Sequence, residues 1–562
     1  MTDIRRTLLW VVFTMSLVLL WDAWNKHTGQ PSLFGAPRPV ATAASGAAGA
    51  APPASAGVPG ADTVAAPGAT GTAAMPTTAA AVPKGEPVTV TTDVVKATFD
   101  SLGGSLVRLE LLGYRDPVDA SRNVVLFDQT AKRLYLGQTG LISVQPNLKL
   151  PNHLTPMAAL PGERTLAAGQ DELVLKFETE PVDGVKLAKT FTFKRGSYTV
   201  GVKHEVNNGS AAAISPQLYL QLARDGNPPE GESSFYFTFT GPALYTDANK
   251  FKKLDFKDIE KGKADHDKTA SNGWISMVQH YFVSAWLMPG NTQPREFRTA
   301  KVGENHYSIA MVQPLGEVAP GASKVHEAVL LAGPQEENKL AALAPGLELV
   351  KDYGWFTILA KPLFWLLTQL HAALGNWGWA IVALVVLLKI AFYWLNASAY
   401  KSMAKMKAIN PKVMELRERH KDNPQQMQQE MMRIYREEKV NPLGGCLPIF
   451  AQMPFFIALY WVLLSSVEMR GAPWIGWIAD LSAKDPWFIL PLLMTLSSLF
   501  QVWLNPTPPD PMQAKLMWFM PLAFSFMFFF FPAGLVLYWL TNNILSIAQQ
   551  WFINKQLGVL GK

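Results

Sequence analysis

The stretch Trp379–Tyr400, WAIVALVVLLKIAFYWLNASAY, decides the fold of this chain. It is almost wholly apolar and carries one charged residue, Lys389. As a helix, Gly378 to Leu395 alone would extend roughly 27 Å, which is about the thickness of the hydrocarbon layer of a bilayer. The stretch therefore predicts a membrane-spanning helix that places an ammonium group slightly past its middle.

Lys389 needs a physical explanation, because a lysine at this depth costs on the order of 2.5–3.5 kcal/mol on insertion scales. One explanation is a water-accessible cavity that receives the ammonium group. The other is snorkelling, in which the side chain reaches the headgroup layer. The nearest polar end of the helix, Asn396, lies about 10 Å away by helix rise, which a lysine side chain does not cover comfortably. We favour the cavity.

Composition divides the chain into a soluble-looking middle and a membrane-like C-terminal part. Of its 562 residues, 49% are hydrophobic and 17% are charged. The net charge of +6 is modest and does not indicate nucleic-acid binding. Basic residues cluster in particular loops, which is a signal of membrane topology. The single cysteine, Cys446, excludes a disulfide within the chain.

The N-terminal region predicts a membrane anchor followed by a linker. In residues 1–24, Arg5 and Arg6 precede an apolar run, and no small-residue cleavage site follows at the right distance. We therefore expect an uncleaved signal anchor. Residues 25–85 are mostly Ala, Pro, Gly, Ser and Thr, which predicts a disordered linker in the exported compartment.

The next region, residues 86–344, changes to a period of two. Apolar and polar residues alternate in Glu172–Glu178 and Tyr198–Val206, and turn signals separate such runs. This pattern predicts a large antiparallel β-sandwich. Its histidines are scattered and form no catalytic or metal-binding motif, so we expect a binding or scaffolding domain.

Two helical segments flank the opening stretch. Residues 352–371 are apolar but interrupted by Lys361 and Pro362, which predicts an amphipathic helix in the outer membrane interface. The strongly basic segment 398–441 predicts a cytoplasmic helical hairpin. Its methionines form either the packed core of the hairpin or an adaptable docking face for a nascent chain or the ribosome; they are Met403, Met406, Met427 and Met431.

Four further apolar runs predict membrane spans. Together with the anchor and the span 376–397 they give six spans and place both termini in the cytoplasm. The fold class is therefore a multi-domain membrane protein: a six-span helical part, an exported all-β domain and a cytoplasmic hairpin. The four spans are 443–466, 487–504, 515–531 and 535–553, and a cytoplasmic tail, 554–562, follows them.

Polar residues in these spans gather near the middle or in the inner half. Isolated polar residues usually hold helices together, but polarity confined to one leaflet across several helices implies a wet groove that opens to the cytoplasm. Asn542, Ser546 and Gln549 share one helical face. We expect the groove to be lined by Lys389, Gln452, Ser497, Gln501, Asn542 and Ser546.

Such a groove can lower the cost of moving a polar segment of a client protein into the bilayer. Lys389 would attract an acidic segment that is not yet exported. The client's apolar helix would then leave along aromatic side chains, namely Trp518, Phe524, Tyr538 and Trp539. No covalent chemistry, cofactor or metal is required.

Two other functions compete with this interpretation. A solute transporter with a cytoplasm-facing half-pocket would usually pair the lysine with a carboxylate, and the five spans after the anchor contain no Asp or Glu. An intramembrane enzyme would need a nucleophile beside a base, and every histidine lies outside the spans.

Several motifs resemble the core signatures of the YidC family of membrane protein insertases. The segment Gly273–Phe282 and the order of anchor, linker and sandwich are similar to the Gram-negative members. The core motifs are YKSMAKM (400–406), EKVNPLGGCLP (438–448), QMP (452–454), DPMQ (510–513) and FPAGLVLY (531–538).

The resemblance implies an inner-membrane insertase and chaperone with a five-helix core, a hydrophilic groove and a periplasmic β-supersandwich. It implies nascent membrane proteins, the Sec translocon with its accessory subunits, the ribosome and membrane lipids as partners, and no direct contact with nucleic acid. Gln452 matches a groove-lining position, and Tyr538 matches a client-contacting tyrosine. Trp539 stands where a second tyrosine is common. Lys389 stands where the family usually has Arg, so it keeps the charge but loses the two-pronged hydrogen bonding.

Overall fold

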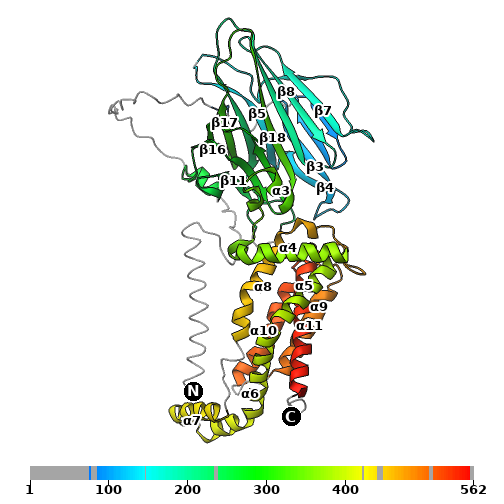
Figure 1. The fold of residues 1–562 in the computed structure, drawn as a ribbon, viewed down its shortest axis with the longest axis vertical. Coiled ribbons are helices and arrows are strands. Elements are labelled where there is room, and N and C mark those ends of the chain that lie inside the picture. The colour runs from blue at the N-terminus through cyan, green and yellow to red at the C-terminus, as the bar shows by residue number, and fades with distance from the viewer. Residues whose placement is uncertain are drawn as a thin grey trace, which may run out of the picture. The chain divides into compact units, whose positions relative to one another are not determined.

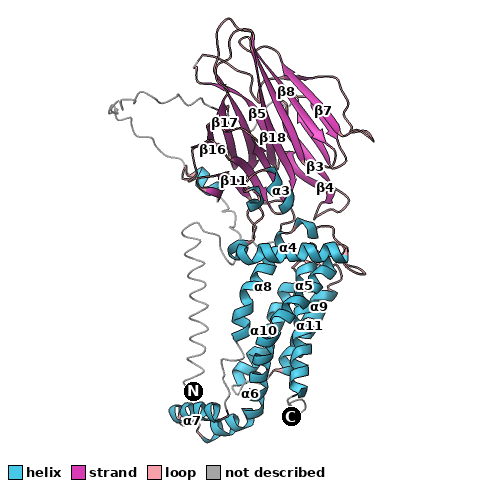
Figure 2. Ribbon diagram, in the orientation of Figure 1, coloured by secondary structure: helices cyan, strands magenta, loops and turns pink. Residues whose placement is uncertain are grey.

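The structure is a computed structural model that describes residues 75–76, 85–145, 147–232, 238–420, 423–438, 447–505 and 511–556. The predicted signal anchor, almost all of the predicted linker, Cys446 and the last six residues of the predicted tail lie outside the described residues. The described part consists of a β domain followed by a helical part (Figures 1 and 2).

The first of two β-sheets in the described residues has nine strands, each paired antiparallel with its neighbours. In spatial order the strands are β1 (Pro87–Thr91), β2 (Val95–Asp100), β3 (Ser105–Arg115), β4 (Asn123–Gln129), β5 (Leu134–Ser143), β10 (Pro216–Asp225), β17 (His306–Pro314), β16 (Arg295–Gly303) and β13 (Thr269–Ala270).

The second sheet also has nine antiparallel strands among the described residues. In spatial order they are β12 (Lys250–Lys253), β11 (Gly241–Thr246), β14 (Trp274–Gln279), β15 (Phe282–Leu287), β18 (Ser323–Pro334), β9 (Thr199–Asn208), β8 (Val185–Lys194), β7 (Glu172–Thr179) and β6 (Met157–Ala159).

The two sheets pack face to face around one apolar core. In β7 the side chains alternate between exposed and buried, as the period of two predicts. Phe99 of the first sheet meets Phe191 of the second with ring centroids 4.5 Å apart. Trp286 crosses the core in the same way and donates its indole N–H to the carbonyl of Gln221, 3.1 Å away. The large all-β domain expected from the sequence is therefore confirmed.

Short helices connect or follow the strands, and longer helices make up the C-terminal part, where α11 packs against α5, α6, α8 and α9. The helices are α2 (Phe256–Glu260), α3 (Glu337–Leu343), η1 (Leu347–Val350), η2 (Gly354–Phe356), α4 (Thr357–Leu374), α5 (Trp377–Ala391), α6 (Tyr393–Arg419), α7 (Pro424–Glu437), α8 (Leu447–Ser465), η3 (Val467–Met469), α9 (Ile489–Leu504), α10 (Pro511–Phe528) and α11 (Ala533–Gln556).

The turn between α4 and α5 has clear local causes. Gly375 ends α4 with a φ of 68°, a left-handed conformation that glycine adopts without strain. Asn376 then begins α5, because its side-chain oxygen accepts a hydrogen bond from the backbone N–H of Trp379 at 3.1 Å. The same side chain donates to the carbonyls of Pro473 and Trp474, which ties the turn to the loop before α9.

The opening stretch differs from the single helix that the sequence predicts over 376–397. It forms α5 and the start of α6, which meet at Phe392 with a bend of 68°. The Phe392 ring packs edge-on against Phe455 of α8, with ring centroids 5.1 Å apart, and Gln549 of α11 donates to the carbonyl of Tyr393. These contacts from neighbouring helices accompany the bend, which neither proline nor glycine marks in the sequence.

Among the described residues, no single helix is both long and apolar enough to pass the test for a membrane span. The segments Trp377–Ala391 and Tyr393–Met406 pass it together as a bent pair.

Candidate functional site: a cavity around Lys389

Lys389 points into the helical part and contacts another helix. It lies in the last turn of α5, and its Nζ atom donates a hydrogen bond to Oγ of Ser546 on α11 at 2.7 Å. Ser546 is buried, and its own hydroxyl donates to the carbonyl of Asn542 at 2.7 Å. The hydroxyl thus accepts from the ammonium group and donates to the backbone, which satisfies it in both directions.

The ammonium group borders a small cavity between α5, α8 and α11. Its volume is about 20 Å³, which leaves room for about one water molecule. One part of its lining is polar, and the rest is apolar and largely aromatic. The lining residues are Val385, Leu388, Lys389, Phe392, Gln452, Phe455, Phe456, Leu459, Tyr538 and Asn542.

A second polar pair stands beside this cavity. Gln452 of α8 donates to Oδ1 of Asn396 on α6 at 2.9 Å. Asn396 is buried, and among the described residues its Nδ2 atom has no hydrogen-bond partner. A buried donor without a partner costs roughly 1–3 kcal/mol, so this position favours a bound water molecule or a polar group of a ligand.

The other two predicted groove residues, Ser497 and Gln501, both lie on α9 and do not line the cavity of Lys389. Ser497 of α9 accepts a hydrogen bond from Asn543 of α11 at 2.8 Å. Gln501 borders a wider groove of about 410 Å³ between α9 and α10, together with Phe524. Four of the six predicted groove residues therefore lie at or beside the cavity of Lys389, and the other two lie on α9, with Ser497 facing α11 and Gln501 facing α10.

The buried polar residues of α11 extend beyond the face that the sequence suggests. The sequence suggests one face formed by Asn542, Ser546 and Gln549. The buried polar residues of α11 are Asn543, Ser546, Gln550 and Asn554, whereas Asn542 lines the cavity of Lys389. Both sets follow helical spacing, and both lie among apolar residues, so the neighbouring helices decide which set is buried.

The four residues predicted as an aromatic exit also separate into two places. Trp518 and Phe524 of α10 are about half exposed, at 43% and 50%. Tyr538 is only 2% exposed and lines the cavity of Lys389. Trp539 packs against Phe528, with ring centroids 5.0 Å apart. Tyr538 therefore shares a site with the ammonium group, and of the four predicted residues Trp518 and Phe524, both on α10, are the exposed ones.

The hairpin methionines lie at the edge of the packed region between α6 and α7. Met403, Met406, Met427 and Met431 are each half-buried. The best-buried side chains of α6 beyond Met406 are aliphatic: Ile409, Val413 and Leu416. Both interpretations of the methionines, packed core and docking face, stay predictions.

Comparison with known proteins covers almost the entire chain. The family model for the YidC periplasmic domain matches residues 87–366, and that for the 60Kd inner membrane protein matches residues 369–558. The membrane protein insertase YidC of Cupriavidus metallidurans is 57% identical over 556 residues, covering 99% of this chain and 98% of the relative. The chain belongs to the YidC family.

A second full-length relative supports the same family. The resemblance to the YidC family predicted from the motifs is therefore confirmed. The membrane protein insertase YidC of Janthinobacterium sp. (strain Marseille) is 53% identical over 571 residues, covering 99% of this chain and 100% of the relative. A crystal structure of an active YidC insertase is 18% identical, with a TM-score of 0.39, and covers 83% of this chain and 92% of that one. Membership in the family makes this chain an inner-membrane protein whose β domain is periplasmic.

Proposed function

We propose that the cavity around Lys389 is where the polar segment of a client protein enters the membrane. The chain is a membrane protein insertase, as its family membership and its full-length relatives establish, and its substrates are nascent membrane proteins. The proposal concerns the mechanism. The observation that carries it is the hydrogen bond from Lys389 to Ser546, which fixes a cation among the helices beside a cavity with a polar part.

The fixed cation would attract an acidic segment of the client. Charges interact more strongly in such surroundings than in water, because the effective dielectric constant is lower. Gln452 and Asn542 offer amide groups to the same segment, and the unpartnered Nδ2 of Asn396 lies next to Gln452. Since the cavity has room for only about one water molecule, α5, α8 and α11 must separate to admit a peptide.

The client's apolar helix would leave along aromatic side chains into lipid. Phe455 and Phe456 of α8 line the cavity together with Lys389. Trp518 and Phe524 on α10 are open to the surroundings. A helix that slides along these surfaces keeps its apolar residues out of water, and no covalent step is needed. The chain would therefore act as an insertase and chaperone and not as an enzyme.

Orientation in the membrane follows from the periplasmic β domain. The basic hairpin, α6 and α7, would face the cytoplasm. Both termini would also be cytoplasmic, with six spans in total. The exposed side chains of Trp355 in η2 and of Ile358 and Trp365 in α4 suit these helices to the outer lipid interface. The hairpin is the surface we assign to the ribosome, and the Sec translocon with its accessory subunits is the expected partner within the membrane.

A reconstitution experiment tests the role of the cation. Purified protein in vesicles is offered a client with an acidic exported tail. Lys389→Glu should block its insertion, because the attraction becomes repulsion, whereas Lys389→Arg should be tolerated. Normal insertion by Lys389→Glu would overturn the electrostatic role. Measuring solute flux in the same vesicles distinguishes insertion from transport.

A further inference from the structure

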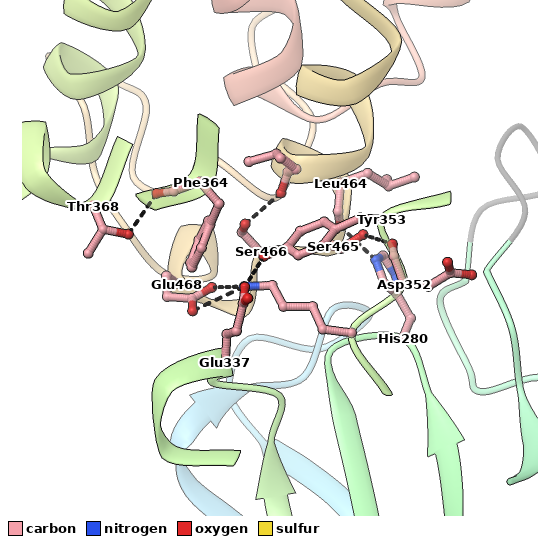
Figure 3. A network of polar contacts seen from close by, with 12 residues as sticks. His280, Glu337, Asp352, Tyr353, Phe364, Thr368, Leu464, Ser465, Ser466 and Glu468 are labelled. Carbon is pink, nitrogen blue, oxygen red and sulfur yellow. Dashed lines mark hydrogen bonds and ion pairs between the residues drawn. The ribbon is translucent and has the colours of Figure 1, made fainter. Parts of the chain in front are cut away.

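A buried ion pair joins the β domain to the helical part. Lys351 directly follows η1, and Glu468 lies in η3, just after α8. The Nζ atom of Lys351 lies 3.1 Å and 3.2 Å from the two carboxylate oxygens of Glu468. Nζ also lies 3.7 Å from the centre of the Phe364 ring of α4. One ammonium group therefore contacts two further segments, η3 through Glu468 and α4 through Phe364. Figure 3 labels these two partners.

The pair is shielded from solvent to an unusual degree. The side chain of Lys351 is 0% exposed, and that of Glu468 is 19% exposed. Burial lowers the pKa of Lys351, and the Glu468 carboxylate opposes this shift. A charge in such a place is tolerated only with a partner, so removing one member leaves the other uncompensated.

The end of α8 is held by the same neighbourhood. The last carbonyl groups of a helix have no partner within the helix. Here the carbonyl of Leu464 accepts a hydrogen bond from Nε2 of His280, in the turn between β14 and β15, at 2.9 Å. Burial lowers the pKa of His280 to about 4, so the ring is neutral at pH 7 and donates from Nε2–H. Ser465 donates to the carbonyl of Asp352 at 2.6 Å (Figure 3).

The helix held in this way also forms a wall of the cavity. Phe455, Phe456 and Leu459 of α8 line it. All three lie between Pro454 and the C-terminal end of α8 at Ser465. No proline interrupts the helix between them and that end, so they are rigidly connected to it. A tilt at that end would therefore move these side chains relative to Lys389.

We propose that Lys351 is a positioning residue: through Glu468 it fixes the outer end of α8 against the β domain and so sets the aromatic wall of the insertion cavity. This inference rests on the proposed role of the cavity. It assigns the β domain a mechanical function, namely to fix the position of α8 relative to α5 and α11.

The test compares two ion pairs that both lie near α4. Glu468→Gln removes the charge from the buried pair. Glu348→Gln is the matched control, because Glu348 and Lys361 lie 3.8 Å apart, and the Lys361 side chain is 39% exposed. The two glutamate side chains are similarly exposed, at 22% and 19%, but only the control pair has a solvent-exposed lysine, and such a pair contributes little. We expect Glu468→Gln to slow client insertion at least threefold and Glu348→Gln to leave it unchanged.

A distance measurement separates positioning from loss of folding. Spin labels replace Val325 of the β domain and Met453 of α8, which are 50% and 48% exposed, in a chain whose Cys446 is changed to Ser. Glu468→Gln should broaden the distribution of distances between the labels while the β domain keeps its thermal midpoint. The exchanged pair Lys351→Glu with Glu468→Lys should restore both the narrow distribution and insertion.

The outcomes distinguish this inference from the proposed function. Loss of the Lys351–Glu468 ion pair should slow the insertion of clients with acidic and with neutral tails alike. Loss of the Lys389 charge should slow the insertion of the acidic client. An unchanged distance distribution, or normal insertion by Glu468→Gln, would overturn the role of Lys351. That result would leave the test of Lys389 intact.

Discussion

Replacing Lys389 by methionine should stabilise the folded protein slightly and yet weaken its function. The ammonium group costs on the order of 2.5–3.5 kcal/mol at this depth of the membrane. Its hydrogen bond to Ser546 stabilises the folded protein by roughly 1.5–3 kcal/mol, as hydrogen bonds to charged groups do. After the change the Ser546 hydroxyl still donates its hydrogen bond to the Asn542 carbonyl, so no buried donor loses its partner. The expected gain in stability is therefore about 0–2 kcal/mol.

The functional loss can be worked from the distance between the two charges. A client carboxylate that enters the opened cavity and stays separated from Nζ by one water molecule would lie roughly 5–6 Å from it. At an effective dielectric constant near 20, this attraction is worth roughly 3 kcal/mol, or on the order of a hundredfold in occupancy. Lys389→Met should lose most of that factor for an acidic client.

The assay uses two clients that differ only in the tail. Vesicles with wild-type protein or Lys389→Met receive a client with an acidic tail or the same client with a neutral tail, and protease protection measures insertion. The acidic client should lose far more than the neutral one. Equal losses for both clients would refute the reasoning, because they would indicate damage to the cavity and not loss of charge. Lys389→Arg serves as the charge-preserving control.

Three further predictions concern stability. Gly378→Ala should cost roughly 1–3 kcal/mol, measured by thermal unfolding in detergent, because the added Cβ would lie 2.2 Å from the Trp474 ring; an unchanged midpoint would contradict this packing. Asn376→Ala should cost roughly 1–2 kcal/mol through the lost helix cap, while Asn376→Asp keeps the acceptor and loses less; equal losses would argue against the cap. Burial lowers the pKa of Lys189 from 10.5 to about 7. Between pH 7 and pH 10.5 the folded state therefore binds fewer protons than the unfolded chain. The free energy of unfolding then rises with pH by up to about 1.4 kcal/mol per pH unit. Lys189→Met should reduce that slope in urea unfolding at pH 7 and pH 9, and an unaltered slope would contradict the assignment.

Periodic features of the sequence predict much of the fold. Alternation in segments such as Glu172–Glu178 predicts strands because one face of each strand packs into the core. Apolar runs predict α8, α9, α10 and α11, although their ends differ from the predicted spans by a few residues. The charge of Lys389 stands out in the sequence because the residues around it are apolar.

Features set by neighbouring elements could not be predicted. Nothing local at Phe392 marks the bend between α5 and α6, which coincides with contacts from α8 and α11. Tyr538 is as compatible with an exposed aromatic face as with a buried cavity, because the helix pattern does not say which neighbour it meets.

The ion pair between Lys351 and Glu468 could not be predicted from the sequence either. Lys351 and Glu468 are 117 positions apart in the chain, and each resembles an ordinary surface charge in sequence. His280 and Leu464 are 184 positions apart. Only the packing of α4 and α8 against the β domain brings these groups together and excludes water from them.

Site-specific crosslinking tests most directly whether clients pass the cavity of Lys389. A photoreactive side chain replaces Asn542, which lines the cavity, or Phe519, which is 63% exposed on α10, and a ribosome-stalled client is irradiated in membranes. We predict that the client's acidic flanking residues crosslink to position 542 and its apolar helix to position 519. Crosslinks at position 519 with none at position 542, at any length of stalled chain, would contradict the account.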